Sequence, residues 1–456
     1  MVVLPSQDGG PARRFALRPV RVLLVATTLV VLGVLLGAAL AFSLSFVLGP
    51  ARLRSEADHL RLELAELRDE LARLKSDQPG DASPTLGEVM RDDALRIRPP
   101  TGQEPTVRVA VLHGRGALDV EAAGLLLVDP EGHPLNIADG KAKLVVSGRE
   151  VTVTGEDTSA SFPTGTRIEG RAPSLRATQS AGSVHVLPLP LILHVDGDEI
   201  VLVSEMAIER YLPGVVAAEM PASWGIEAKK AQAIAARTYA LMQKVGATGA
   251  WDLEAAVEDQ AWSGEVIDGS TRAAVASTLG EILTVDGWVV STFYSAACAG
   301  KSELPPAVWP GRPWHGNTMV DCDSCARSPY DRWSVELTPA EILGAVAAGG
   351  GARKVMGLHV RQRSQADRVT RIEVETDGAP LGMTGNEFRE KLGWSRVKSS
   401  AFEVTVSGAA FRLAGRGAGH GVGLCQWGTR GLAADGKDYA QILSHYYPGS
   451  RVEKIW

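Results

Sequence analysis

The chain has 456 residues, of which 45% are hydrophobic and 22% are charged, so it is long enough to form more than one compact domain. Its formal net charge is −6, and it contains no long run of basic residues. A nucleic-acid partner would require lysines and arginines clustered on one surface. The composition therefore disfavours nucleic acid as a partner and predicts a globular protein.

An apolar segment near the N-terminus predicts a membrane anchor. The run from Val22 to Ala51 contains no charged residue, and a helix needs only ~20 apolar residues to cross a bilayer. A cleavable signal peptide is the alternative, because Ala39-Leu40-Ala41 offers a cleavage site. The apolar run, however, continues beyond the usual length of the hydrophobic region of a signal peptide. We therefore expect residues 22–50 to form an uncleaved transmembrane signal anchor.

Charged residues beside this segment predict its orientation. The N-terminal side carries four arginines and the other side mixes both signs: Arg13, Arg14, Arg18 and Arg21 against Arg52, Arg54, Glu56 and Asp58. By the positive-inside rule, residues 1–21 stay in the cytoplasm and the chain after residue 50 is exported. We expect a single-pass protein of the cell membrane whose C-terminal region is extracytoplasmic.

Residues 51–75 show a heptad pattern. Apolar residues recur at alternating intervals of four and three, at Leu53, Ala57, Leu60, Leu64, Leu67, Leu71 and Leu74. This pattern is typical of a parallel coiled coil, so we expect a homodimer through this stalk. A single amphipathic helix lying on another domain would show the same stripe. Residues 76–105 are rich in Asp, Pro, Gly and Ser and predict a linker.

From residue 106 the sequence changes to short β-branched runs separated by turn signals such as Asp196-Gly197-Asp198. Residues 106–200 contain no cluster of catalytic residue types, so we expect a β-rich supporting subdomain there. The chemistry is expected in residues 201–456, which contain two unusual motifs.

The first motif runs from Tyr211 to Trp224, and a helix is predicted after it over 226–245, where apolar residues recur at i, i+3 and i+4. The second motif runs from Gly417 to Gly428 and surrounds a histidine with glycines. The two segments read YLPGVVAAEMPASWGIEAKKAQAIAARTYAL and GHGVGLCQWGTRGLAADGKDYAQILSHYYPG.

These segments resemble the two signatures of the SpoIID/LytB family. Weaker matches lie between them in the family order: DQAWSG at 259–264, GNEFREKLG at 385–393 and KSSAF at 398–402. Sporulation members of this family are lytic transglycosylases that cut peptidoglycan strands between N-acetylmuramic acid and N-acetylglucosamine, and other members enhance wall amidases. The resemblance implies that Glu219 is the catalytic acid/base. It also implies that four further residues lie in or beside the glycan groove: Lys230, Arg237, His420 and Gln426.

The surroundings of Glu219 give an independent reason to expect acid–base chemistry. Glu219 follows the apolar run 215–218 and precedes Met220-Pro221. Desolvation raises the pKa of a carboxyl and keeps a proton available near neutral pH. Without the resemblance, Glu219 would be interpreted as an ordinary carboxylate at a helix end. The corresponding alternatives are a structural imidazole in a Gly-rich turn for His420 and a solvated or ion-paired side chain for Arg237.

Four cysteines leave several interpretations open: Cys298, Cys322, Cys325 and Cys425. An even number in an exported protein is consistent with disulfides, whereas the spacing of Cys322 and Cys325 suits a tetrahedral metal completed by the other two sulfurs. Some members of the resembled family hold zinc with cysteine and histidine, which keeps a structural zinc in consideration. Here the segment 298–301 lacks such a histidine, and His315 is the nearest substitute. Free thiols are the third alternative, and the expected chemistry itself requires no cofactor.

We therefore expect an α+β fold in which a β-rich scaffold and a few helices line a glycan-binding groove that contains Glu219. The leading hypothesis is a lytic transglycosylase that cleaves glycan strands without hydrolysis. Two alternatives stay open. One is a non-catalytic module that binds peptidoglycan and stimulates a cell-wall amidase, and the other is an envelope organiser that acts through its coiled coil.

A reporter that is active only in the cytoplasm tests the expected topology when it is fused after Trp456. The arginines on the N-terminal side should hold that side in the cytoplasm, so the fused reporter should be silent. Reporter activity from this fusion would contradict the orientation.

Overall fold

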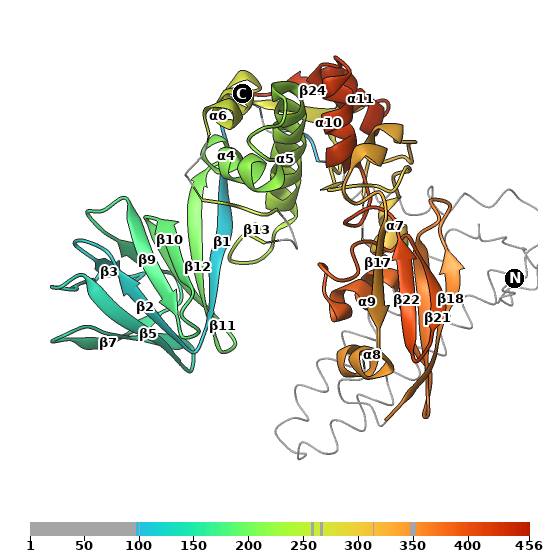
Figure 1. Cartoon of the computed structure of the whole chain (residues 1–456). Coiled ribbons are helices and arrows are strands. Elements are labelled where there is room, and N and C mark those ends of the chain that lie inside the picture. Colours follow the sequence, from blue (N-terminus) through green and yellow to red (C-terminus); the bar gives the residue numbers. More distant parts are fainter. Residues whose placement is uncertain (1–96, 100, 257–259, 265–267, 313, 347–352) are drawn as a thin grey trace, which may run out of the picture. The chain divides into compact units, whose positions relative to one another are not determined.

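The computed structural model describes residues 97–99, 101–256, 260–264, 268–312, 314–346 and 353–456 (Figure 1). The predicted anchor and coiled coil lie outside these residues, as does most of the predicted linker. None of the helices in this described part combines the length and the apolar character that crossing a bilayer requires. The described part is a mixed α+β structure rich in strands, which confirms the predicted fold class.

Two sheets built mainly from the first strands share one hydrophobic core. The strands are β1 (Thr106–Arg115), β2 (Ala117–Glu121), β3 (Leu126–Val128), β4 (Pro134–Asn136), β5 (Lys141–Ser147), β6 (Glu150–Thr154), β7 (Ser159–Pro163), β8 (Thr166–Glu169), β9 (Ser174–Gln179), β10 (Val184–Pro188), β11 (Leu191–Asp196) and β12 (Glu199–Ala207). With β13 (Leu253–Glu254) at one edge, the strand orders are β13-β1-β12-β11-β8-β3-β4 and β10-β9-β2-β5-β6-β7. Because side chains alternate along a strand, each sheet turns one apolar face to this core, with Leu118 and Leu144 from one sheet and Leu202 from the other.

A second core surrounds α5 (Ile226–Gly246), which confirms the helix predicted over 226–245. Its neighbours are α4 (Ile208–Glu219), α6 (Gly269–Ser277), α10 (Gln426–Ala434), α11 (Tyr439–Tyr446), β13 (Leu253–Glu254), β14 (Glu281–Val285), β15 (Trp288–Val289) and β24 (Arg451–Lys454). All four helices and β14 contact α5, so it is buried on most sides rather than along one stripe. Its many alanines let these neighbours approach closely.

A third core forms in the segment between the two motifs. Its elements are β17 (Trp333–Leu337), α8 (Pro339–Val346), β18 (Val355–Arg363), β19 (Val369–Thr376), β20 (Leu381–Met383), α9 (Gly385–Leu392), β21 (Phe402–Ser407) and β22 (Ala410–Gly415). Before it come β16 (Tyr294–Ser295), α7 (Pro305–Val308) and the 3₁₀ helix η2 (Asp323–Arg327), and after it comes β23 (Leu424–Cys425). The strand β16 pairs in parallel with β23, although the elements of the third core lie between them in the chain. The third core is therefore an insertion between these two strands.

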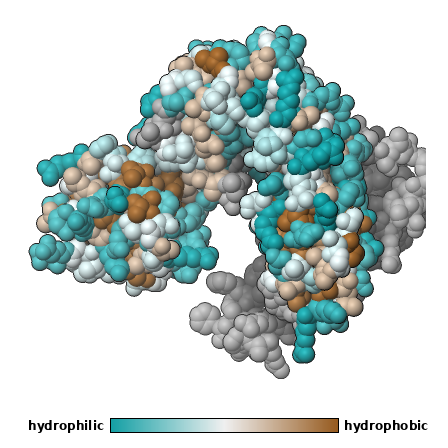
Figure 2. Space-filling view, in the orientation of Figure 1, coloured by the Kyte–Doolittle hydropathy of each residue, from teal (hydrophilic) through white to brown (hydrophobic). Residues whose placement is uncertain are grey.

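The surface drawn in Figure 2 is mainly hydrophilic, and hydrophobic residues appear on it only as small separate patches. Single exposed apolar side chains, such as Val406 at 77% exposure, are normal for folded proteins.

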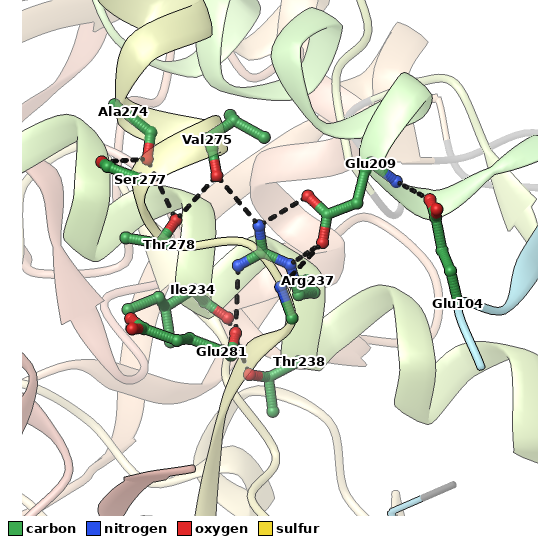
Figure 3. A network of polar contacts seen from close by, with 11 residues as sticks. Glu104, Glu209, Ile234, Arg237, Thr238, Ala274, Val275, Ser277, Thr278 and Glu281 are labelled. Carbon is green, nitrogen blue, oxygen red and sulfur yellow. Dashed lines mark hydrogen bonds and ion pairs between the residues drawn. The ribbon is translucent and has the colours of Figure 1, made fainter. Parts of the chain in front are cut away.

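A buried ion pair joins the helices of the second core (Figure 3). Arg237 of α5 is 0% exposed, and its Nε and Nη2 donate to the two carboxylate oxygens of Glu209, both at 2.8 Å. Its Nη1 donates to the carbonyl of Glu281 in β14 at 3.0 Å. The Glu209 carboxylate also accepts the amide of Gly280 at 3.1 Å. This bidentate pair therefore ties α4 to α5 and β14.

Replacing Arg237 by methionine should destabilise the fold strongly. Removing one partner of a buried pair leaves an uncompensated charge, which costs about 3–5 kcal/mol. Urea unfolding measures the loss. The exposed pair Arg396–Glu341 gives the matched control, because Arg396→Met should cost no more than about 1 kcal/mol. Equal losses in both variants would contradict the importance assigned to the buried pair.

Candidate active site

Glu219 is the last residue of α4, where the helix ends because Met220 is extended. Its carboxyl is partly buried, and the two oxygens accept different donors. Gln426 Nε2 donates to Oε2 at 2.7 Å, and the amide of Ala261 donates to Oε1 at 3.3 Å. Burial raises the pKa of Glu219 above its usual value, and the two hydrogen bonds oppose that shift in part. The site therefore contains a carboxyl that holds its proton to higher pH than an exposed glutamate.

Gln426 is positioned by the second motif. It is the first residue of α10, directly after the β16–β23 pairing, and Cys425 caps the helix by accepting the amide of Gly428 on its Sγ. Gln426 is buried, and its Nε2 also lies 3.5 Å from Oε1 of Gln232 in α5. The structure thus brings Glu219 and Gln426 together, as the resemblance implies, and adds Gln232 to them.

Tyr294 of β16 also belongs to this site. Its hydroxyl is enclosed, and burial raises its pKa well above the usual value, with a further rise from the nearby charge of Glu219. Tyr294 is therefore a neutral group, on the strand that pairs with β23 just before Gln426. Sequence reasoning missed both Tyr294 and Gln232, although a glutamine within an alanine-rich helix was an available signal.

His420 supports the backbone beside Tyr294. Its Nε2 lies 2.8 Å from the carbonyl of Tyr294, and its Nδ1 accepts the amide of Val422 at 3.0 Å. Burial, reinforced by nearby arginines, lowers the pKa of His420 to about 3. The imidazole is therefore neutral, with both nitrogens used inside the protein. This environment matches the structural alternative for His420.

The glycines around His420 allow a close approach of the chain. Gly421 and Gly423 have φ of 79° and 68°, a region that favours glycine. A Cβ would lie 2.1 Å from the guanidinium of Arg368 at Gly421 and 2.1 Å from the carbonyl oxygen of Phe293 at Gly423. The turn therefore packs directly on its neighbours, and side chains at these positions would displace it.

The two remaining predicted residues, Lys230 and Arg237, both form ion pairs with other side chains. Lys230, in the N-terminal part of α5, pairs with Glu227 at 2.8 Å and lies over the ring of Tyr439. Arg237 corrects the sequence-based prediction of a glycan contact. Its guanidinium is fully enclosed by the pair with Glu209, so it presents no surface to a glycan.

Two tryptophans pack beside the end of α4. Trp224 and Trp427 meet edge to face with ring centroids 5.2 Å apart, and Arg430 lies over both rings. Trp224 shares a small core with Met220, the residue after Glu219. The tryptophan pair therefore packs around Met220, the residue that follows Glu219 in the chain.

The four cysteines form one buried cluster. Their sulfurs all lie within 4.8 Å of one another, and Cys298 and Cys325 are 3.7 Å apart at Sγ, too far for a disulfide. A tetrahedral zinc with Zn–S bonds near 2.3 Å has S–S edges of about 3.8 Å. His315 is not part of this cluster in the described residues.

Arg368 is a buried, positively charged side chain next to the cysteine cluster. Arg368 is 1% exposed and donates to the carbonyl of Cys298 at 2.7 Å, while its Nε and Nη1 have no partner in the described residues. An unpaired buried cation is costly, whereas four thiolates around a divalent metal carry a net charge of −2. The donor set and its neighbour therefore both fit a structural metal.

Residues 196–285 match the family described as Stage II sporulation protein, SpoIID, and residues 320–423 match a domain of unknown function that covers most of the insertion. An uncharacterized protein of Brachyspira hyodysenteriae is 32% identical over 257 residues, which cover 55% of this chain and 68% of the relative. Stage II sporulation protein D of Bacillus subtilis is 27% identical over 277 residues, covering 55% of this chain and 76% of that protein. The amidase enhancer of Bacillus subtilis is 27% identical over 290 residues, which cover 52% of this chain and 40% of that protein. This chain therefore belongs to the SpoIID family.

Proposed function

We propose that this protein acts on the bacterial cell wall as a lytic transglycosylase, which cleaves peptidoglycan strands between N-acetylmuramic acid and N-acetylglucosamine with Glu219 as acid and base. The environment of Glu219 is the observation that carries the proposal: a carboxyl with a raised pKa, held by two defined donors. Membership of the SpoIID family and the similarity to sporulation protein D support a cell-wall role.

The reaction needs only one acid–base group. Protonated Glu219 donates its proton to the glycosidic oxygen as the bond to the muramic carbon breaks. The resulting carboxylate then accepts the proton of the 6-hydroxyl of the same sugar, whose oxygen attacks that carbon and closes a 1,6-anhydro ring. No water is consumed, so the paired carboxylates of ordinary glycoside hydrolysis are not required. Gln426 and the Ala261 amide fix the orientation of the carboxyl and stabilise its ionised form between the two transfers.

A second function is supported by the amidase enhancer among the relatives. In that case the chain binds peptidoglycan without cutting it and stimulates a cell-wall amidase. The two functions differ in their products, because only the transglycosylase generates anhydro-muramic ends.

Replacing Glu219 by glutamine should abolish most cleavage while leaving the fold intact. The amide keeps the size of the carboxyl, and its single oxygen still accepts from Gln426 or from the Ala261 amide, but the transferable proton is lost. General acid–base catalysis contributes about 10²–10⁴-fold, so turnover should fall by at least that factor. Mass spectrometry of anhydro-muramic products, paired with a strand-binding assay, measures both effects. Glu205→Gln, at an exposed position in β12, is the matched control.

Undiminished cleavage by the glutamine variant would remove Glu219 from the mechanism. A wild-type protein that binds strands and stimulates an amidase without forming anhydro ends would establish the second function instead. Cleavage by the wild type should decline as the pH rises through the raised pKa of Glu219, because the acid must be protonated at the start.

We also propose that the four cysteines hold one structural zinc. Elemental analysis of the purified protein should find about one zinc per chain, and Cys325→Ser should lose it and lower the unfolding temperature. Ser324→Ala, at the neighbouring position, should keep the metal. Absence of metal together with a mass lowered by a pair of hydrogens per bridge would support disulfides. Absence of metal with four alkylatable thiols would support free cysteines.

A further inference from the structure

A large cavity opens on the insertion, and neither Glu219 nor Gln426 lines it. Its volume is about 790 Å³, and it lies along β17, β22 and β21 beside Ala299 and Lys301. Small residues form much of its lining, including Ser334, Ala401 and Ala414. In the sheet register Ala414 pairs with Ser334, so these two short side chains lie next to each other across the strands. The sheet therefore provides a shallow floor on which a ligand fits.

Basic side chains predominate around this floor. The lining contains five of them and two acidic ones: Lys301, Arg332, Arg363, Arg412 and Arg416 against Asp367 and Glu403. Both acids pair with the same arginine, Arg363, at 3.5 and 2.8 Å. The chain as a whole has a net charge of −6. The excess of basic side chains in this cavity therefore contrasts with the acidic balance of the whole sequence.

Several of these cations are available to a ligand. Arg412 has no ion-pair partner in the described residues, since Glu336, opposite it in the register, accepts from Ser407 instead. The side chain of Arg332 is 85% exposed. Its ion pair with Asp331 is long, with 3.8 Å between Nε and Oδ2. Arg416 does form a 2.9 Å pair with Asp331 but keeps about half its surface exposed. Guanidinium groups match carboxylates in geometry and bind them through paired hydrogen bonds.

The cavity is continuous in the chain with the candidate active site. Arg416 directly precedes the Gly-rich turn, and Ala418 of that turn bridges to Ala297. Ala299, on the cavity wall, follows the cluster cysteine Cys298. Trp333 closes the same region, with its Nε1 donating to the carbonyl of Gly417 at 2.9 Å. A polymer lying in the cavity would therefore lie against the same turn that positions His420 and Gln426.

We propose that this cavity is a subsite for carboxylates of the peptidoglycan strand, an inference that rests on the proposed function. Each muramic residue of a strand without peptides carries a lactyl carboxylate. In a strand with stem peptides that group is amidated, and the peptides supply carboxylates of their own. Both sources offer the chemistry that the arginines recognise, whereas an oligomer of N-acetylglucosamine alone has the same type of backbone without charge.

Binding measurements on the full chain carrying Glu219→Gln test the subsite without cleavage of the ligand. The variant Arg332→Gln/Arg412→Gln removes two exposed charges, and Arg149→Gln/Arg451→Gln removes two exposed charges outside the cavity. The cavity variant should bind peptidoglycan strands about fivefold to tenfold more weakly, with a smaller dependence on salt. The control variant should bind them unchanged, and neutral N-acetylglucosamine oligomers should bind equally to all.

Two strand preparations distinguish the carboxylate sources. A loss confined to strands without peptides assigns the cavity to lactyl carboxylates, and a loss confined to peptide-bearing strands assigns it to stem-peptide carboxylates. Equal binding by the cavity and control variants would overturn the subsite, as would an equal loss for the neutral oligomer. Anhydro-product formation by the corresponding variants with Glu219 intact is scored separately, so failure of the subsite and failure of the proposed function give different results.

Discussion

The buried ion pair between Arg237 and Glu209 fixes the direction of α4, and the position of Glu219 follows from it. Arg237 lies in the middle of α5, whereas Glu209 lies in the first turn of α4. Because α4 is one continuous helix of 12 residues, the position of its first turn bears on where its last residue lies. The pair also binds the carbonyl of Glu281, so α4 cannot tilt without breaking contacts to the neighbouring strand. Arg237, which is fully buried, thus helps to position Glu219 through its ion pair with Glu209.

The partner of Glu219 arrives from a distant part of the chain. Gln426 is 207 positions away and reaches the carboxyl because β23 pairs with β16 and α10 begins directly after it. The same turn carries Cys425, whose sulfur belongs to the cluster that also contains cysteines from just before the insertion. The base of the insertion is therefore joined, through the β16–β23 pairing and the cysteine cluster, to the segment that carries Gln426.

Local sequence patterns predicted the features that depend on residues close together in the chain, such as a helix or the apolar surroundings of one side chain. The i, i+3, i+4 spacing predicted α5 almost to its ends, and the apolar run before Glu219 predicted a raised pKa, whose direction the structure bears out. The burial of Gln232 and Arg237 in α5 was not predicted, because it comes from elements far along the chain. Tyr294 was missed for the same reason: its place in the site arises from strand pairing. The anchor and the coiled coil stay predictions, since they lie outside the described residues.

The opposing influences on the pKa of Glu219 are compatible with the proposed role, in which the carboxyl serves first as acid and then as base. Burial alone would hold the proton but would make the carboxylate left after the first transfer too unstable. The two donors alone would stabilise the carboxylate but would leave little acid near neutral pH. Gln426 supplies one of those donors, and its position depends on the cap made by Cys425. Cys425 thus connects the four-sulfur cluster, through the start of α10, to the hydrogen bond that Glu219 accepts from Gln426.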